Sequence, residues 1–308
     1  MPELDAPAPA PLDLTRAEDA SRLALLIGTA TRADGQPPFS DQALVEVRSG
    51  VRSGSTVEFD GMIAGVSIRT ASSPFEAEFV VAPRARHHGL GEALLADILA
   101  QAGGDVRIWA HGDHPDARAL AHRHGLVPVR ELLQLRLTPV VAPVAIPGRA
   151  ADVAAFRPGI DDAEWLAINA AAFADHAEQG GMTQADLDAR MAEDWFDAGD
   201  FLIARGGDGA MTGFCWLKIE AGAGVDAGDD DADDDAVGEF YAVGVSPAAQ
   251  GTGLGRALVN AGLARLVERD IRSSHLYVEG DNTAAVSLYR SVGFTDHSID
   301  IQYASRGA

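Results

Sequence analysis

The stretch "SPAAQGTGLGRALVNAGLARL", from Ser246 to Leu266, places three glycines at alternate positions directly before a segment with helical periodicity. An earlier stretch, "APRARHHGLGEALLADILAQA" from Ala82 to Ala102, has the same order of features. A strand, a glycine-rich turn and a helix together point several backbone N–H groups at one place, at the positive end of the helix dipole. Glycine lets a ligand approach the backbone there, because no side chain blocks it. Both stretches therefore predict a phosphate-binding turn.

The two glycine stretches belong to an internal duplication. Five pairs of identical residues are 164 positions apart: Pro83 and Pro247, Gly89 and Gly253, Leu90 and Leu254, Gly91 and Gly255, and Leu94 and Leu258. Five more pairs are 168 apart: Gly112 and Gly280, Asp113 and Asp281, Ala117 and Ala285, Leu120 and Leu288, and Gly125 and Gly293.

The 308 residues suit two domains of ordinary size. We expect domains at residues 1–138 and 151–308, joined by a linker at 139–150 that is rich in proline and small residues.

Hydrophobic periodicity and turn residues predict an α/β fold with a mixed sheet in each half. In the second half the expected strands are 152–158, 201–205, 212–220, 238–245, 274–280 and 297–304. The expected helices there are 161–173, capped by Asp161 or Asp162, 183–196, capped by Thr183, one following Gly253, and 282–293. In the first half we expect strands within 56–70, 75–82, 105–112 and 131–137, a helix after Gly91 and a helix ending at Gly125.

Composition restricts the class of partner. The net charge of −22 argues against binding to nucleic acid or to an anionic membrane. No run approaches the roughly 20 apolar residues of a membrane helix, and the Pro/Ala-rich N-terminus does not resemble a secretory signal. The single cysteine, Cys215, fits a reducing cytoplasm and is expected to be a buried small hydrophobe. We expect a monomeric cytoplasmic protein that acts on a small molecule.

Two polar clusters leave alternatives open. The Asp-rich run within residues 226–235 is expected to be a solvated loop, and a cation site is the alternative, although EF-hand spacing is absent. A zinc site is conceivable at His111, His114, His122 and His124. Because no cysteine or clear ligand pair accompanies these histidines, we expect no metal.

Both glycine stretches read [Arg/Gln]-x-x-Gly-x-Gly, at residues 86–91 and 250–255. Neither copy has the Lys-Ser/Thr of a Walker loop, and Arg256 occupies the third glycine position of a Rossmann turn. The pattern resembles the acyl-CoA loop of the GCN5-related N-acetyltransferase (GNAT) superfamily. The later block "EGDNTAAVSLYRSVGF", Glu279 to Phe294, resembles that superfamily as well. The resemblance implies two tandem GNAT acyl-CoA N-acyltransferase domains that use acetyl-CoA as cosubstrate. The plainer alternative is a pair of helix starts in which glycine serves packing alone.

The resemblance also implies which residues contact acetyl-CoA. In the second half these are Val243, Gly244, Val245, Gln250, Gly251, Thr252, Gly253, Leu254, Gly255, Arg256, Asn282, Thr283, Ala284, Ala285, Val286 and Ser287. In the first half the corresponding residues are Phe79, Val80, Val81, Arg86, His87, His88, Gly89, Leu90 and Gly91.

Acetyl transfer to an amine needs a base, an oxyanion donor and an acid for the departing thiolate. By resemblance Tyr289 is the general acid, and Glu239 is a candidate base that acts through water. The alternatives are that Tyr289 is a core residue and Glu239 a surface residue. The first half has Ala121 at the position of Tyr289, so we expect it to be non-catalytic while its intact loop can still bind acetyl-CoA.

Over nearly its whole length the chain resembles the mycothiol synthases, a family of tandem GNAT proteins from actinobacteria. The resemblance rests on "WAHGDHPDARALAHRHGLVPVRELLQLR", "NAAFADHAEQGGMT" and "EFYAVGVSPAAQGTGLG". It implies acetylation of the cysteinyl amine of a cysteine–glucosamine–inositol acceptor, held by Asp41, Glu178, Lys218, Glu239 and Tyr277. Two alternatives stay open: a GNAT enzyme for another small amine or a protein N-terminus, and a non-catalytic acetyl-CoA-binding regulator.

Overall fold

The computed structural model describes residues 8–71, 75–143, 153–174, 177–220 and 236–305. The chain divides into two compact units. Unit 1 comprises Met1–Leu133, Glu279–Asp281 and Ser298–Ala308, and unit 2 comprises Gln134–Val278 and Asn282–His297. The Asp-rich run, most of the expected linker and the first seven residues lie outside the described part of the chain.

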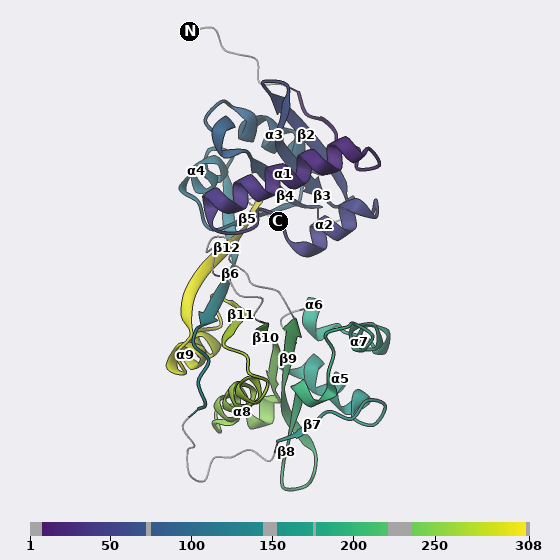
Figure 1. Ribbon diagram of the computed structural model, residues 1–308, viewed down its shortest axis with the longest axis vertical. Coiled ribbons are helices and arrows are strands. Elements are labelled where there is room, and N and C mark those ends of the chain that lie inside the picture. Colours follow the sequence, from purple (N-terminus) through teal and green to yellow (C-terminus); the bar gives the residue numbers. More distant parts are fainter. Residues whose placement is uncertain (1–7, 72–74, 144–152, 175–176, 221–235, 306–308) are drawn as a thin grey trace. The chain divides into compact units, whose positions relative to one another are not determined.

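Unit 1 is an α/β unit whose strands follow the order β1-β2-β3-β4-β5, with β12 beside β5. β4 and β5 are parallel, and the other pairs are antiparallel. Its first five strands are β1 (Ala10–Pro11), β2 (Ser53–Phe59), β3 (Met62–Arg69), β4 (Phe75–Val81) and β5 (Val106–His111). Its helices are α1 (Ala17–Asp34), α2 (Asp41–Arg48), α3 (Leu90–Ala102) and α4 (Pro115–Arg123) (Figure 1). Helices α3 and α4 and strands β2 to β5 were predicted from the sequence, but α1 and α2 were not.

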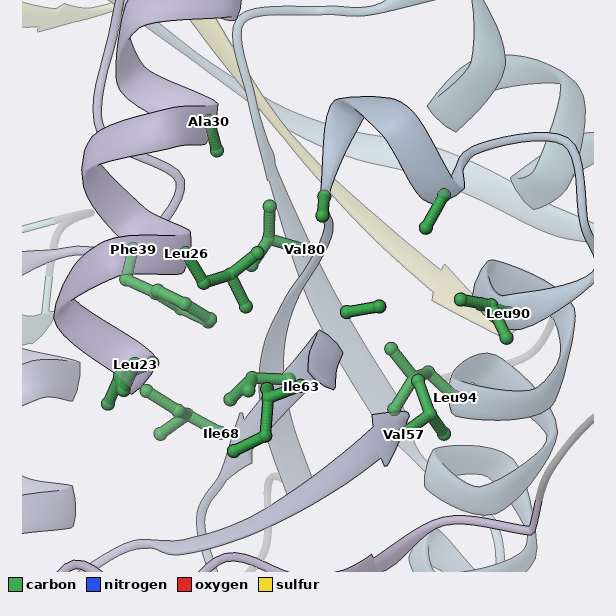
Figure 2. Packing of buried hydrophobic residues seen from close by; sticks show 14 of the residues in the cluster. Leu23, Leu26, Ala30, Phe39, Val57, Ile63, Ile68, Val80, Leu90 and Leu94 are labelled. Carbon is green, nitrogen blue, oxygen red and sulfur yellow. The ribbon is translucent and has the colours of Figure 1, made fainter. Parts of the chain in front are cut away.

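The core of unit 1 lies between these helices and the sheet. Figure 2 shows apolar side chains from α1, from the strands and from α3 meeting in one cluster. Leu26 on α1, Ile68 on β3 and Leu94 on α3 are at most 4% exposed. Full burial of such side chains stabilises a fold by about 1.5–3 kcal/mol each.

Unit 2 has the strand order β11-β10-β9-β8-β7. Its strands are β7 (Val153–Ala155), β8 (Phe201–Arg205), β9 (Met211–Glu220), β10 (Val237–Val245) and β11 (Ser273–Glu279). Its helices are α5 (Asp162–Ala172), α6 (Ala177–Gly180), α7 (Gln184–Met191), α8 (Leu254–Glu268) and α9 (Thr283–Ser291). The core is aromatic, because the Phe201 ring stacks against both Phe156 and Trp216 with centroids 4.3 Å away in each case.

The helix predicted over 183–196 begins where expected and ends early. Thr183 forms a capping box with Asp186, as predicted, but α7 stops at Met191. Trp195 and Phe196 both turn toward Trp216, at centroid distances of 5.8 and 6.1 Å. Consecutive residues of a helix point about 100° apart and cannot share one target so closely, so the chain leaves the helix before them.

Two long strands, β6 (Leu126–Leu137) and β12 (Thr295–Ser305), are divided between the units. The strand predicted at 297–304 is present in β12, but its last part pairs antiparallel with β5, from Asp300 opposite His111 to Ala304 opposite Arg107. Tyr303 of β12 belongs to the core of unit 1. The end of the chain therefore completes the sheet of the first half. None of the described helices has the length and apolar character needed to cross a membrane.

Candidate active site

Both glycine-rich turns follow a strand and lead into a helix with an open N-terminus. In unit 2, a short 3₁₀ turn (Pro247–Ala249) follows β10, and Gly251 and Gly253 have φ angles of +74° and +90°. Gly253 is the N-cap of α8 and gives it no side-chain cap. The first N–H groups of α8 therefore have no side-chain acceptor at the cap and can meet a phosphate.

Unit 1 repeats this backbone. The 3₁₀ turn Pro83–Ala85 follows β4, and His87 and Gly89 have φ angles of +63° and +81°. Gly89 caps α3 without a side-chain hydrogen bond. His87 takes a conformation that favours glycine.

The packing around the turns confirms the register of the duplication. A Cβ on Gly255 would lie 3.4 Å from Leu288 and 3.8 Å from Val245. A Cβ on Gly91 would lie 3.6 Å from Leu120 and 3.9 Å from Val81. Leu288 corresponds to Leu120 in the predicted duplication, and Val245 corresponds to Val81. The start of the helix therefore packs in the same way in both units.

Two parallel strands part beside each turn. β10 pairs with β11 only from Val237 to Glu239, opposite Ser273 to His275, and then continues to Val245. A β-bulge shifts the register of β10 against β9 between Phe240 and Ala242. In unit 1, β4 pairs with β5 as far as Glu78 and leaves only Phe79–Val81 beyond the last pair. Unit 2 therefore has the longer stretch of backbone that is free on the side of its parallel neighbour, and bulges of this kind often adjoin active sites.

A row of polar side chains crosses the sheet of unit 2 where the strands part. Glu239 lies opposite Lys218 of β9 and opposite His275 of β11. His275 Nε2 is 3.9 Å from Glu239 Oε2, and both side chains are less than a fifth exposed. Lys218 and Glu239 were predicted from the sequence as acceptor contacts, but His275 was not. The signal was available, because His275 lies two residues before Tyr277 and so shares its face of the strand.

His275 is held neutral by its surroundings. Burial, and to a lesser extent the nearby cations Arg136 and Lys218, lower its pKa to about 4. Its Nδ1 atom is buried and has no hydrogen-bond partner among the described residues. A buried N–H without an acceptor is costly, so the tautomer with the proton on Nε2, toward Glu239, is favoured.

The other expected acceptor contacts are distributed over both units. Tyr277 is 48% exposed, and its hydroxyl accepts a hydrogen bond of 3.0 Å from Gln134. Lys218 Nζ is 3.1 Å from Glu220 and 5.6 Å from the centroid of Trp195. Glu178 lies in α6, but its side chain is outside what the structure describes. Asp41 is exposed in the first turn of α2 in unit 1.

Tyr289 lies on α9 and is 8% exposed, with its ring 5.8 Å from that of Phe294. Burial, and to a lesser extent Cys215, raise its pKa, so the hydroxyl keeps its proton at neutral pH. Cys215 is fully buried, and burial raises the pKa of its thiol as well, as suits a packing residue. Asn282 caps α9, since its Oδ1 accepts a 3.1 Å bond from Ala285 N–H.

The basic residues of the first turn already have partners. Arg86 donates to both carboxylate oxygens of Asp34, at 2.8 and 2.6 Å, and this pairing raises its pKa. His87 Nε2 lies 3.5 Å from Asp116, and His88 Nδ1 lies 2.8 Å from the Arg86 carbonyl. The corresponding Gln250 reaches only the Val245 carbonyl, at 3.4 Å. Ala121, at the position of Tyr289, is a core residue of unit 1.

Four histidines of the first half, His87, His111, His114 and His124, lie within 4.0 Å of carboxylates. Among the described residues, no group of three or more His, Cys, Asp or Glu side chains is arranged to hold a metal ion. His124 pairs with Glu92, and His111 lies between Glu78 and Asp300.

Comparisons with known proteins agree with this geometry. The model of the acetyltransferase (GNAT) family matches residues 166–294. The solved GCN5-related N-acetyltransferase from Sphaerobacter thermophilus has a TM-score of 0.72 at 21% identity, over 99% of this chain and 96% of that one. A tandem GNAT protein from the clavulanic acid biosynthesis pathway has a TM-score of 0.67 at 14% identity, over 96% and 97%. These structures share the fold of this chain over nearly its whole length.

Relatives in sequence are much closer. A protein named mycothiol acetyltransferase from Sanguibacter keddieii is 45% identical over 94% of this chain and 93% of its own length. One of the same name from Streptomyces griseus is 43% identical over 97% and 98%. On this similarity along nearly the entire length, the chain belongs to the mycothiol acetyltransferase family of GNAT enzymes.

Proposed function

We propose that the protein transfers the acetyl group of acetyl-CoA to the cysteinyl amine of 1D-myo-inositol 2-(L-cysteinylamino)-2-deoxy-α-D-glucopyranoside, giving mycothiol and CoA. The observation that carries this proposal is the 45% identity to a mycothiol acetyltransferase over 94% of the chain. The row of polar side chains and the open helix terminus of unit 2 support it, because they match the needs of an amine acceptor and a pyrophosphate.

The turn before α8 suits the pyrophosphate of acetyl-CoA. A Cβ added at Gly251 would meet no other atom within 4 Å, so the turn is open there, and Gly253 begins a helix without a side-chain cap. The backbone of Val243–Val245, which has no β11 partner, suits the pantetheine arm and offers an N–H group to the carbonyl oxygen of the acetyl group. Together these groups bind the cosubstrate through backbone atoms, so its affinity depends little on side-chain charge.

Glu239 and Tyr289 suit the two proton transfers. Glu239 takes a proton from the acceptor ammonium through water, and the free amine attacks the acetyl carbon. The N–C bond forms as the C–S bond breaks, and Tyr289 gives its proton to the sulfur. The attacking nitrogen loses its second proton to water, which returns a proton to the Tyr289 phenolate, so the products are the neutral amide and the CoA thiol. An α-amino group has a pKa of about 7.7–8.0, so a carboxylate acting through water suffices near neutrality. His275, opposite Glu239, is neutral and leaves the charge of the carboxylate for the ammonium.

We place turnover within residues 151–308. Unit 1 repeats the phosphate-binding turn, but Ala121 has no proton to donate. Unit 1 then serves as a support that retains an acetyl-CoA-type turn. Lys218, Glu239 and Tyr277 supply hydrogen bonds to the acceptor from one face of the unit 2 sheet, with Glu178 added from α6.

The test is mass spectrometry of a reaction that contains the purified protein, acetyl-CoA and the cysteine–glucosamine–inositol amine, with simple amines in parallel reactions. We expect one added acetyl group on the pseudo-disaccharide amine. If only another amine gives a product, the proposed acceptor is wrong, while the proposal of acetyl transfer stands. No turnover with any amine would favour a non-catalytic acetyl-CoA-binding protein.

A pair of tyrosine variants tests the assignment of the acid. Tyr289→Phe should lower kcat by about a hundredfold or more, because general acid catalysis contributes at least that much. Tyr303→Phe is the matched control, since Tyr303 is equally buried in the core of unit 1. Equal rates for both variants would exclude Tyr289 as the acid.

A further inference from the structure

Strand β10 of unit 2 contains one residue more than the facing part of β9. Phe240 pairs with Leu217, and Ala242 pairs with Trp216. Tyr241 between them therefore has no partner on β9 and is the extra residue of the bulge. The Tyr241 ring contacts the Trp216 ring, with centroids 5.2 Å apart, so Tyr241 and Ala242 share the face that carries Trp216. Consecutive residues of a strand normally point to opposite faces, so the bulge reverses the orientation of every residue after it.

The bulge decides which side chains of β10 face the aromatic core. Gly244 lies opposite Phe214, and a Cβ on Gly244 would be only 2.5 Å from the Phe214 ring. Val245 points the other way, 3.8 Å from where a Cβ on Gly255 of α8 would lie. Without the extra residue, Val243 would come to lie opposite Phe214, where even a Cβ does not fit. A regular pairing of β10 with β9 is therefore excluded, and a weakened bulge would loosen the strand rather than shift it by one residue.

The bulge also decides which N–H groups of β10 point toward β11. Directly after β10, the Ser246 N–H donates to the Thr212 carbonyl at 2.9 Å. Hydrogen-bonded and non-hydrogen-bonded pairs alternate along antiparallel strands, so the Gly244 N–H points to β9 and those of Val243 and Val245 point the other way. The pairing of β10 with β11 has ended by then, so these two N–H groups face the place where the strands part. A strand without the bulge would turn the Val243 N–H toward β9 instead.

The extra residue of the bulge is held by α7 and by the segment that follows it. Arg190 on α7 donates from Nε to the Tyr241 hydroxyl at 2.6 Å. The Tyr241 ring also contacts Trp195, with centroids 5.4 Å apart, in addition to its contact with Trp216. Trp195 reaches this place because α7 ends at Met191. The bulge therefore cannot move along β10 without breaking a hydrogen bond to a charged group and two ring contacts.

Unit 1 has neither the bulge nor the anchor along the corresponding strands. β4 pairs with β3 without a shift of register, from Gly65 opposite Val81 to Arg69 opposite Ala77. Ala77 lies 164 positions before Tyr241, the offset of the duplication, and its side chain has no polar group that could be held. The anchored bulge is therefore a feature of the unit to which we assign acetyl transfer.

We propose that Arg190 and Tyr241 form a positioning pair that holds the bulge of β10 and thereby directs the Val243 N–H at the carbonyl oxygen of the acetyl group. The inference rests on the proposed function, in which this stretch of β10 supplies the oxyanion donor. Val243 is the nearer of the two candidate donors to Glu239, whereas Val245 adjoins the glycine-rich turn. Neither Arg190 nor Tyr241 is assigned a contact with a substrate, so both are positioning residues.

Loss of the anchor should lower kcat and leave KM for the acceptor unchanged. The acetyl oxygen gains its full charge only in the transition state, so an oxyanion donor contributes mainly to kcat. Removal of a whole donor lowers kcat by about a hundredfold to a thousandfold, and a donor that is present but poorly held should cost about tenfold. We expect this tenfold loss for Arg190→Gln and for Tyr241→Phe. The phenylalanine retains the ring contacts of Tyr241, so this variant should fold.

The experiment is a double-mutant cycle on the full chain, with Arg190→Gln, Tyr241→Phe and the combination of both. If the two residues act through one hydrogen bond, the double variant loses no more of kcat than either single variant. Arg205→Gln is the matched control, because Arg205 on β8 binds Asp161 at 2.7 Å in unit 2 and β8 does not adjoin β10. It should lower stability to urea and leave kcat unchanged. Additive losses in the cycle would overturn the proposal, and so would a wild-type kcat for Tyr241→Phe.

Amide hydrogen exchange, followed residue by residue with NMR, gives a readout that needs neither acceptor nor acetyl-CoA. In the wild type the Gly244 N–H, which points to β9, should exchange more slowly than the Val243 N–H. Arg190→Gln and Tyr241→Phe should each speed exchange at Gly244 by about tenfold, because the strand around the bulge opens more often. Arg205→Gln should not change the ratio of the two rates.

The exchange data separate a failure of the anchor from a failure of the proposed function. Unchanged exchange at Gly244 in both variants would overturn the positioning pair, even if kcat falls. Faster exchange at Gly244 together with no product from any amine would reject the proposed function, and with it the catalytic use of a bulge that Arg190 still holds.

Discussion

Raising the pH from 6 to 10 should deprotonate His111 on β5. This removes its ion pairs with Asp300 on β12 and Glu78 on β4 in unit 1. His111 has a pKa of about 9 in the folded protein, raised by Asp300 and Glu78, against an ordinary value of 6.5. One pKa unit corresponds to about 1.4 kcal/mol, so the protonated His111, after its burial penalty is offset, contributes a net of about 3 kcal/mol to folding. Because the folded pKa is the higher one, this contribution is complete below pH 6.5, decreases as the pH rises and is lost above pH 9.

The measurement is urea unfolding of the wild type and His111→Gln at pH 6.0, 7.5, 9.0 and 10.0, followed by circular dichroism. A chain of two units can show more than one unfolding transition, so each urea transition is fitted by itself. Other titrating groups contribute equally to both proteins and cancel in the difference between their free energies of unfolding. We expect this difference to shrink by about 3 kcal/mol between pH 6 and pH 10.

A difference that stays constant across this range would refute the reasoning, because it would mean that His111 does not change its charge between these limits. A difference that grows with pH would mean that His111 is neutral in the folded protein. His124→Gln serves as the control, since His124 is more exposed and its exposed pairing with Glu92 should contribute little at any pH.

Three further predictions concern unit 2. Glu239→Gln should lower kcat/KM by about a hundredfold at pH 7 and recover part of the loss toward pH 9, where the acceptor amine loses its proton unaided; a loss that is independent of pH would argue against a base. His275 should show a constant imidazole chemical shift from pH 5.5 to 9, since its pKa is lowered to about 4, and a titration near 6.5 would contradict its neutral role. Lys218 is the only lysine in the sequence, so an amine-reactive label should modify one internal site, and saturating acceptor should protect it; labelling at an unchanged rate would place Lys218 outside the acceptor site.

The sequence predicted the parts of the fold that depend on local backbone chemistry. Gly253 and Gly89 were identified by spacing alone, and both adopt the positive φ angles that cap a helix. Thr183 was identified by capping chemistry, and Gly293 follows α9 with a φ of +106°. Such features depend on a few neighbouring residues, so one sequence is enough to predict them.

The features that the sequence analysis missed depend on strand pairing between distant segments. The alternation of 297–304 predicts a strand but carries no information on its partner, so the pairing of β12 with β5 could not be foreseen. His275 gains its position opposite Glu239 from the register of two strands joined by α8. The pairing of Arg86, a predicted acetyl-CoA contact, with Asp34 more than fifty residues earlier was likewise not foreseen.

The two units differ most at the point where their parallel strands part. In unit 1 the last pair is Glu78 with Trp109, and the Glu78 carboxylate then reaches His111, two residues further along β5, which ties the strands together beyond their hydrogen bonds. The positions that correspond in unit 2 hold Ala242 and Glu279, which cannot form such an ion pair.

Unit 2 instead has a bulge in β10, and this strand continues to Val245, paired with β9 but beyond its last pair with β11. A place for the acetyl group requires strands that stay apart, and a rigid support requires strands that stay together. The same backbone motif thus has parallel strands that part early in unit 2 and strands tied by Glu78 and His111 in unit 1, which favours unit 2 as the proposed place of acetyl transfer.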